Sequence, residues 1–323
     1  SDVYKRQIEK EVLRLLKESG DYIPGSKLAK ILNVSKPMIH KVIESLRRKG
    51  YVIVSHSKKG YKLLLLDDLS LAGNYIRDLG TRIDFYVHYV PQCSSTQDIA
   101  KSLAESGVPE GLVVIAEEMY SGRGRLGRKW YAPKGGLWIS ILLRPKRIES
   151  LQLMSLATGV AVVKAIEKLL NVELRLKWPN DVIYMDRKLA GILVEAGVEV
   201  DTIHYVIVGI GVNVNNELPS ELKDHAVNLK SILGFEVPRI SILRSLLREL
   251  DDVYYLLTTS NTYTILREWI RYSDTIGRRV KVQFMDFTVE GKAIDIARDG
   301  SLIVIDDASK RYIIRAGDII HLR

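Results

Sequence analysis

Residues 122–130 decide which nucleotide-binding folds the chain can adopt, and they read GRGRLGRKW. Gly122, Gly124 and Gly127 match the G-x-G-x-x-G fingerprint of dinucleotide-binding folds, which needs a helix N-terminus directly after it. The residues that follow, YAPKGG at 131–136, do not continue as a helix. Gly122 and Gly127 also have P-loop spacing, but Arg-Lys stands where that motif requires Lys followed by Ser or Thr. The stretch therefore excludes both folds.

The same stretch still predicts an anion-binding loop. Four cations, Arg123, Arg125, Arg128 and Lys129, fall within seven residues. Glycines let the backbone approach a ligand closely, and guanidinium groups offer paired donors to phosphate or carboxylate. Such a density of like charges is unfavourable unless an anion relieves it. The alternative is a mobile surface turn with incidental arginines.

A second cluster, KWPND at 177–181, combines a cation, an aromatic ring, a rigid bend, an amide and a carboxylate just before a predicted strand. These groups suit a nucleotide: Trp178 would stack on it and Lys177 would supply charge. Asn180 and Asp181 would bind Mg²⁺ or the ribose. The alternative is a structural turn that contains a buried tryptophan.

Three further segments carry polar groups at the ends of predicted elements. Lys188, in RKLAGILVE at 187–195, would reach an anion in a pocket floored by a sheet, or would be a solvated cation at a hairpin tip. The segment GIGVNVN at 209–215 ends a strand whose glycines admit a ligand. The hydroxyls of 94–97, SSTQ, would cap a helix or bind a polar head group.

The net charge of the chain is confined to its first fifth. Residues 1–66 hold 15 Lys/Arg and 6 Asp/Glu, a net charge of +9, and the other 257 residues hold 33 of each. A basic module on a neutral body indicates a polyanionic partner for that module alone. A generally charged, solvated surface is the alternative.

The pattern of residues 1–66 favours a winged helix-turn-helix. The expected elements are helices over 4–18, after a capping Ser26 and from Lys36 to Lys49 behind a capping Ser35, the last ending at Gly50, and a hairpin of 51–54 with 61–64. The third helix would enter a DNA major groove and the wing tip would meet phosphates. The candidate DNA contacts are Ser35, Lys36, Met38, His40, Lys41, Lys58 and Lys59. A winged helix that only docks proteins is the alternative.

The rest of the chain is expected to form two domains behind a linker at 67–80. Residues 81–273 predict an α/β domain with a mixed sheet, and residues 274–323 predict a small SH3-like β-barrel. Helices are expected over 96–106, 151–170 and 240–258. Strands are expected over 85–89, 112–116, 137–143, 182–185, 188–194, 206–212, 280–284, 288–296, 302–306 and 311–315.

The overall composition excludes several classes of protein. With 46% apolar and 27% charged residues, the chain is typical of a globular protein rather than a disordered one. Its single cysteine, Cys93, excludes an internal disulfide framework and a cysteine-based zinc site. No apolar run approaches the length of a membrane span, and no signal peptide is recognised at the start. These features predict a cytoplasmic protein with no membrane partner.

In this order and combination, the segments resemble biotin protein ligases. The resemblance covers essentially the whole chain, and with the winged helix it is to the bifunctional type that also represses a biotin operon. It implies that ATP and Mg²⁺ activate biotin to biotinyl-5′-AMP. It further implies that biotin passes to a lysine of a biotin carboxyl carrier protein. Operator DNA and a second copy of the chain are the other implied partners.

The resemblance also implies roles for individual residues. Ser95 and Thr96 match residues that hydrogen-bond the ureido ring of biotin, and Gln97 stands where Asn is more usual. Arg123, Gly124 and Arg125 match the loop over biotin and the adenylate. Lys188 matches the lysine at the biotin carboxylate and the activated phosphate. The positions that match residues near ATP or its Mg²⁺ are Trp130, Asn180, Asp181 and Asn213, with Asp181 the candidate metal ligand.

One position departs from the family pattern. Met119 stands where the family often has a Gln that contacts the biotin head group. Either a neighbour supplies that contact, or biotin binds with one hydrogen bond fewer, at a cost of ~0.5–1.5 kcal/mol. Two other functions are left open by the sequence. One is a lipoate or octanoate ligase, and the other is a biotin-sensing repressor without transfer activity.

Overall fold

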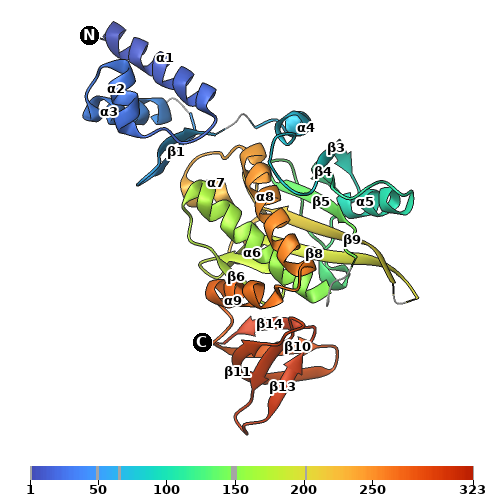
Figure 1. Cartoon of the computed structure of the whole chain (residues 1–323). Helices are drawn as coiled ribbons and strands as arrows, with labels where there is room; N and C mark the ends of the chain where they lie inside the picture. Colours follow the sequence, from blue (N-terminus) through green and yellow to red (C-terminus); the bar gives the residue numbers. More distant parts are fainter. Residues whose placement is uncertain (1, 49–50, 65–66, 147–150, 201, 323) are drawn as a thin grey trace.

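The computed structural model describes residues 2–48, 51–64, 67–146, 151–200 and 202–322. Figure 1 shows a helical N-terminal part, a central sheet with helices against it, and a C-terminal part made of short strands. This architecture confirms the expected fold class of a winged helix, an α/β domain with a mixed sheet and a β-rich C-terminal domain. The domain limits stay predictions, and the one at residue 66 lies outside the described residues.

The N-terminal part is a winged helix with an apolar core of its own. Its elements are α1 (Asp2–Ser19), α2 (Gly25–Leu32), α3 (Lys36–Arg48), and the antiparallel wing strands β1 (Ile53–His56) and β2 (Gly60–Leu63). Leu16, Leu28 and Ile43, one from each helix, are at most 1% exposed and belong to one cluster of buried side chains. The apolar periodicity of each helix therefore places its stripe against the other two.

The helix starts differ in how well they were predicted. Ser35 Oγ accepts a hydrogen bond from the Met38 amide at 3.3 Å, as expected of a cap of α3. Ser26 does not cap α2, because the helix begins at Gly25 behind Pro24. The expected helix end at Lys49 and Gly50 lies outside the described residues.

The segment expected to be a linker is folded onto the central domain. It forms the short helices η1 (Leu69–Leu71) and α4 (Ala72–Tyr75). Leu69, Ala72 and Ile76 are at most 3% exposed and belong to the main core. Asp67 anchors the start of the segment through its ion pair with Arg239 Nε at 2.8 Å. The apolar side chains of this segment thus anchor it in the core of the central domain.

Arg239, which is only 5% exposed, joins this segment to the central sheet. Its Nη1 donates to Glu117 Oε1 at 2.6 Å and to the Gly136 carbonyl at 3.1 Å. We expect Arg239→Met to lower the free energy of unfolding by about 3 kcal/mol, because both partner carboxylates would lose their buried counter-charge. Urea unfolding measures this loss. Arg279→Met is the control, since Arg279 pairs with the exposed Asp307 and should cost at most about 1 kcal/mol. Equal losses of unfolding free energy in the two variants would show that Arg239 contributes no more than an exposed ion pair.

The central domain is built on a seven-stranded mixed sheet in the order β3-β4-β5-β9-β8-β7-β6. Its strands are β3 (Tyr86–Cys93), β4 (Leu112–Met119), β5 (Leu137–Leu143), β6 (Arg175–Lys177), β7 (Asp181–Tyr184), β8 (Arg187–Glu199) and β9 (Thr202–Val212). Strands β3 and β4 pair in parallel, and every other neighbouring pair is antiparallel. The mixed sheet expected from the sequence is confirmed.

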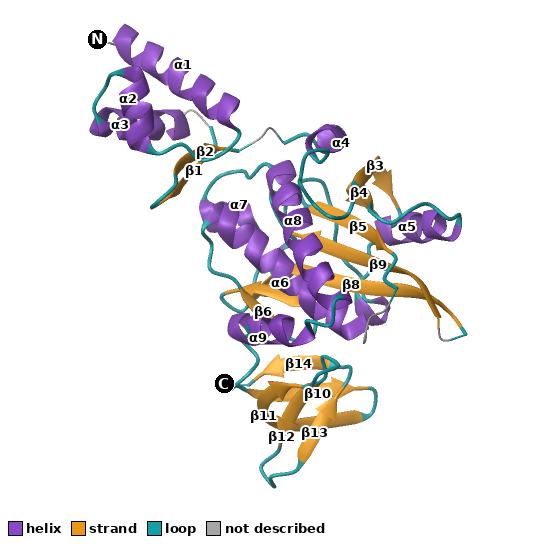
Figure 2. Cartoon of the chain, viewed as in Figure 1, coloured by secondary structure: helices purple, strands orange, loops and turns teal. Residues whose placement is uncertain are grey.

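Helices cover both faces of this sheet. The helices α6 (Leu151–Leu170) and α8 (Arg239–Thr258) pack together on one face, as Figure 2 shows. The helix α5 (Thr96–Glu105) packs on the other face. Alternate residues of β4 make this possible, because Val113 and Ile115 join the α6 side while Val114 joins the α5 side. The limits of α6 match the prediction residue for residue.

Several elements were not predicted, and most of them are short. They are β6, α7 (Leu229–Leu233), α9 (Thr262–Tyr272) and β14 (Asp318–His321). Ile265, Leu266 and Trp269 in α9 do have helical spacing and are buried, so that helix had a usable signal. Within the described residues, no helix has the length and apolar composition needed to cross a membrane.

The C-terminal part is a five-stranded antiparallel sheet in the order β13-β12-β11-β10-β14. Its first four strands are β10 (Arg279–Phe284), β11 (Phe287–Ile296), β12 (Leu302–Ile305) and β13 (Arg311–Ile314). The predicted strands are therefore present. Across the described residues β13 and β14 are edges that do not pair with each other, so the expected barrel is an open sheet in its hydrogen bonding.

Candidate functional site

A cavity of about 320 Å³ lies between the central sheet, the glycine loop and the C-terminal sheet. Side chains from segments far apart in the sequence line it, and they include all but one of the residues predicted to bind biotin or nucleotide. These are Ser95, Thr96, Gln97, Met119, Arg123, Gly124, Arg125, Trp130, Lys177, Trp178, Asn180, Asp181 and Lys188.

The start of α5 forms a polar end of the cavity. Ser95 caps the helix, since its Oγ accepts from the Gln97 amide at 3.3 Å. Ser140 on β5 lies beside it, and its Oγ is 2.8 Å from Thr96 Oγ1. The Thr96 amide donates to Met119 Sδ at 3.3 Å, so the methionine sulfur accepts a weak hydrogen bond here. Hydroxyls and an amide therefore converge where the sequence places the head group.

The glycine loop is a hairpin rather than an irregular loop. The Trp130 amide donates to the Gly122 carbonyl at 2.8 Å, and the Gly124 amide donates to the Arg128 carbonyl at 2.7 Å. The tip holds Leu126 in the left-handed region with φ 57°. These cross-strand bonds hold the arginine side chains over the cavity.

Cations gather at the other end of the cavity. Lys188 Nζ lies 2.7 Å from Asp181 Oδ1 and 5.2 Å from the centroid of the Trp130 ring. The Lys188–Asp181 contact is an ion pair whose angles are not those of an aligned hydrogen bond, so this buried carboxylate oxygen keeps unused acceptor capacity. Burial lowers the pKa of Arg125, although Asp318 and Asp181 oppose this shift. A guanidinium stays charged at neutral pH, so it adds a desolvated cation to the site.

The Trp130 indole packs against Gly191 of β8 and Gly211 of β9. A Cβ at Gly211 would come within 2.8 Å of the indole, so only glycine allows this approach. The Trp130 Nε1 is buried and has no hydrogen-bond partner within the described residues. An unpaired buried donor costs free energy, which a ligand acceptor would recover.

Two sequence expectations about this site are corrected. Trp178 borders the cavity, but it is 1% exposed and its Nε1 donates to the Gly300 carbonyl at 3.0 Å, so its ring is packed in the core and is not free to stack on a nucleotide. Asn213 does not line the cavity. It is 4% exposed, and its Oδ1 accepts from Asn216 Nδ2 at 3.1 Å.

The cavity also contains residues that the sequence did not point to. Ser140 lies on a strand whose other residues are all apolar, and Asp318 and Ile319 come from the C-terminal sheet. Asp318 forms an ion pair with Arg128 of the glycine loop. Glu195, on β8, does not line the cavity, but its Oε2 accepts from Nε2 of the lining residue Gln97 at 2.7 Å. Ser140 could have been noticed as the one polar residue in β5, whereas the other contacts depend on tertiary structure.

The candidate DNA contacts lie on the surface of the winged helix. Ser35, Lys36, His40 and Lys41 are exposed at or near the start of α3, and Met38 there is half-buried. Lys58 and Lys59 are exposed at the wing tip. The amides of these two lysines donate to His56 Nδ1 at 3.1 and 3.2 Å, which fixes the turn. The sequence-predicted DNA residues therefore form two exposed groups on one module.

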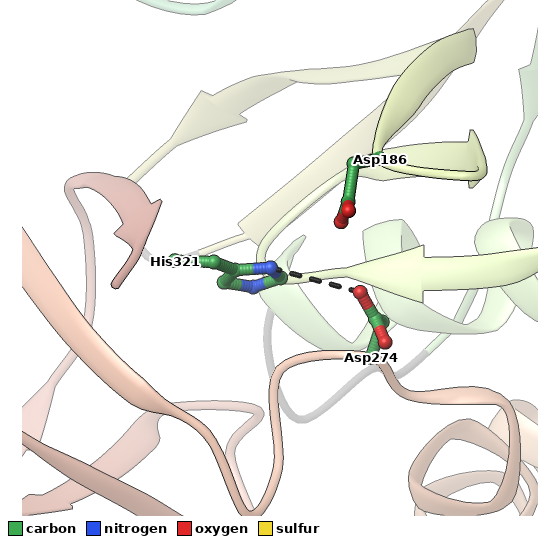
Figure 3. Close-up of side chains that lie close together, drawn as sticks. All are labelled: Asp186, Asp274 and His321. Atoms are coloured by element: carbon green, nitrogen blue, oxygen red, sulfur yellow. Dashed lines mark ion pairs between the residues drawn. The ribbon is translucent and has the colours of Figure 1, made fainter. Parts of the chain in front are cut away.

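A separate cluster of ligand-type side chains lies where the C-terminal sheet meets the central domain. Asp186, Asp274 and His321 place one ligand atom each within 4.8 Å of one another (Figure 3). Arg278 Nη2 already lies 2.9 Å from Asp274 and 3.8 Å from Asp186. The guanidinium thus offsets part of the charge of these two carboxylates, and the cluster joins domains rather than offering an open metal site.

His321 in this cluster makes stability depend on pH. Burial, with help from Lys177 and Arg278, lowers its pKa from 6.5 to about 4, although Asp274 opposes this. Between these two values the unfolded chain binds a proton that the folded chain does not, so stability is full above pH 6.5 and falls as the pH drops toward 4. We expect a loss of roughly 2–3 kcal/mol at pH 4.5 that is absent in His321→Gln, as measured by urea unfolding at pH 7 and 4.5. The same loss in both proteins would refute this.

Fold and site together define a ligase class in which one cavity holds a polar head group and a nucleotide. The chain matches the biotin/lipoate A/B protein ligase family over residues 89–213. An HTH domain matches residues 9–62, and the biotin protein ligase C-terminal domain matches residues 275–322.

Individual relatives agree over most of the chain. A protein of Bacillus subtilis named bifunctional ligase/repressor BirA is 33% identical, covering 92% of this chain and 94% of its own length. The Escherichia coli protein of the same name is 30% identical, covering 90% of each chain. A solved structure of the Aquifex aeolicus biotin protein ligase in complex with biotin and ATP has a TM-score of 0.65 and 31% identity, covering 73% of this chain and 98% of that one. This chain belongs to the biotin protein ligase family.

Proposed function

We propose that the chain, an ATP-dependent biotin protein ligase that is also a repressor, performs two transfers in one cavity. A carboxylate oxygen of biotin attacks the α-phosphorus of ATP, which gives biotinyl-5′-AMP and releases pyrophosphate. The ε-amine of a lysine on a biotin carboxyl carrier protein then attacks the activated carbonyl carbon, and AMP leaves. The observation that carries this proposal is that Arg123, Arg125 and Lys188 line the same cavity as the polar start of α5.

The cations would serve the first transfer. A carboxylate and a triphosphate repel each other, so fixed positive charge is needed to bring them together and to stabilise the charge that builds up. Lys188 would face the biotin carboxylate and the α-phosphate, with Arg123 and Arg125 closing the loop over them. Lys177, Trp130 and Asn180 would contact ATP.

Asp181 would hold Mg²⁺ together with the phosphates. Its Oδ1 is buried and makes no aligned hydrogen bond, and a single carboxylate plus phosphate oxygens is a usual Mg²⁺ environment. The ion would supply charge neutralisation of the phosphates. On this proposal, Lys188 gives up its ion pair with Asp181 when the substrates bind. Lys188 then pairs with the substrate anions, and Asp181 pairs with Mg²⁺.

No enzyme nucleophile is needed for either transfer. Burial raises the pKa of the Cys93 thiol to about 11, so it stays protonated and unreactive at neutral pH. The attacking groups are the biotin carboxylate and then the acceptor amine. This matches a cavity whose chemistry is charge and positioning.

The head group of biotin would lie at the start of α5. Ser95 and Thr96 would hydrogen-bond the ureido ring, with Gly124 and the loop arginines above it. The Met119 thioether offers only a weak acceptor there, and it already accepts from the Thr96 amide. Gln97 and Ser140 are the polar neighbours available at this end.

The winged helix would bind operator DNA as part of a homodimer. One small winged helix buries little surface, so specific binding needs two half-sites. Among the described residues, β3 is an edge strand of the central sheet and would offer its open side to a second copy, whereas the β6 edge is partly occupied by the bridge from Leu176 to Ser273. Sedimentation with and without biotin and ATP tests this dimer, and a monomer under both conditions would refute it.

Biotin-dependent exchange between ATP and labelled pyrophosphate tests the first transfer, and labelling of a biotin carboxyl carrier domain tests the second. A lipoate ligase would instead be stabilised thermally by lipoate, since a ligand at 100 times its Kd adds about 2.7 kcal/mol. Exchange without carrier labelling would indicate a sensing repressor. The absence of exchange with wild-type protein would overturn the proposal.

A further inference from the structure

A continuous series of polar contacts connects the glycine loop to the head-group end of the cavity. Arg123 Nη1 lies 2.7 Å from Asp98 Oδ1 on α5, and Arg123 Nη2 lies 3.4 Å from Glu195 Oε2 on β8. One loop guanidinium is therefore held between two carboxylates that belong to different elements.

Glu195 also accepts a hydrogen bond from Gln97. The same Oε2 accepts from Gln97 Nε2 at 2.7 Å, and Gln97 is only 5% exposed. Ser140 Oγ, which is fully buried, donates to Gln97 Oε1 at 2.7 Å. With a donor on its oxygen and a carboxylate on its nitrogen, the Gln97 amide has one orientation only.

The backbone leaves room for this arrangement. A Cβ at Gly209 of β9 would come within 2.7 Å of Gln97 Oε1, so the amide lies across the strand only because glycine is there. Gln97 also lies on the same helical turn as Ser95 and Thr96. Ser140 Oγ contacts both Gln97 Oε1 and Thr96 Oγ1, at 2.7 and 2.8 Å, so a shift of the Gln97 side chain changes the contacts of a hydroxyl that faces the head group.

We propose that Glu195 is a positioning residue that couples the placement of the glycine loop to the orientation of the Gln97 amide. This inference rests on the proposed function, in which the loop covers biotin and Gln97 lies at its head group. Glu195 does not touch the reacting atoms. It acts through Arg123 on one side and through Gln97 on the other, so biotin affinity and loop order depend on the same side chain: Gln97 needs its acceptor oxygen, and Arg123 needs its charge.

The test compares Glu195→Ala and Glu195→Gln with Glu199→Gln in the full-length protein. Glu199 is on the same strand, but it is 78% exposed and pairs only with His204 among the described residues. Two readouts are used. One is the rate of tryptic cleavage after Arg123, Arg125, Arg128 and Lys129 without substrates, followed by mass spectrometry. The other is the KM for biotin and the kcat of pyrophosphate exchange at saturating ATP.

Glu195→Ala is expected to raise the KM for biotin about tenfold with kcat within about twofold, because charged hydrogen bonds that orient the binding site are lost while the reacting groups are kept. Cleavage in the loop should be several-fold faster. Glu195→Gln keeps an acceptor for Gln97 but loses the charge for Arg123. It should therefore retain a KM close to wild type and still show faster cleavage. Glu199→Gln should match wild type in both.

Wild-type KM and wild-type cleavage in both Glu195 variants would overturn the inference. So would a fall in kcat with KM unchanged, which would place Glu195 in the chemical step. If the alanine variant does not fold, Glu195→Gln supplies the cleavage test by itself. A wild-type protein that shows no biotin-dependent exchange defeats the proposed function, whereas the cleavage comparison still tests the contacts among Arg123, Glu195 and Gln97.

Discussion

Replacing Lys188 with alanine is expected to slow biotin-dependent pyrophosphate exchange about 10³-fold, the upper range for removing one group that stabilises charge in a transition state. Lys188 Nζ lies in the cavity, 2.7 Å from Asp181 Oδ1. On the proposed mechanism it is the cation nearest to both the biotin carboxylate and the α-phosphate. Its loss leaves two anions that repel each other at the point where the new bond forms.

The Lys188→Ala effect must be separated from damage to the fold. The lysine is about one-third exposed, so its removal leaves no buried cavity of consequence. Lys230→Ala is the matched control, because Lys230 is an exposed lysine that pairs with Glu236 away from the cavity. It should exchange pyrophosphate at the wild-type rate. A loss below about threefold in Lys188→Ala, with circular dichroism unchanged, would remove this lysine from the mechanism.

Changing four lysines of the winged helix to alanine is expected to weaken DNA binding about 10³-fold at ~0.1 M salt. Each lysine that contacts a phosphate releases counterions from the DNA, and the variant loses this contribution. The four are Lys36, Lys41, Lys58 and Lys59, all of them exposed on α3 or at the wing tip. The slope of log K against log salt should become shallower by about 0.9 per lost contact. Pyrophosphate exchange should not change, since the core of the winged helix is separate from that of the central domain.

Binding to DNA upstream of biotin-synthesis genes, titrated at several salt concentrations, measures this effect. The control protein carries four exposed lysines changed to alanine outside the winged helix, namely Lys101, Lys223, Lys230 and Lys310. It loses the same total charge, so a general electrostatic effect would weaken it equally. Equal weakening in the two proteins would show that the winged helix has no special role, and it would leave a module that docks proteins.

The sequence was sufficient wherever a local pattern decides the structure. The helix over 151–170 and the strand over 137–143 have the predicted limits, because both segments are rich in apolar residues, with all of the strand and most of the helix buried. The winged helix followed from amphipathic spacing and a capping Ser35. The candidate site was also largely predictable, since the resemblance rested on polar motifs whose order along the chain is specific.

The two tryptophans of the polar motifs show where sequence was not enough. Trp130 and Trp178 each follow a lysine directly, so their immediate sequence contexts are alike. Trp178 is held in the core by residues far along the chain: its Nε1 donates to the Gly300 carbonyl, and its amide donates to the Thr275 hydroxyl. Trp130 remains in the cavity because Gly191 and Gly211 clear a surface for it.

The sequence by itself determined which reactive and charged side chains the protein contains. It also determined the helix or strand on which most of them lie, because periodicity and capping act over a few residues. Only the tertiary structure decided which of these groups meet. Glu195 reaches Gln97 across 98 residues of sequence, and Asp318 reaches Arg128 across 190. Such contacts depend on how whole strands and domains pack, and packing is set by the burial of distant apolar surfaces that no local pattern contains.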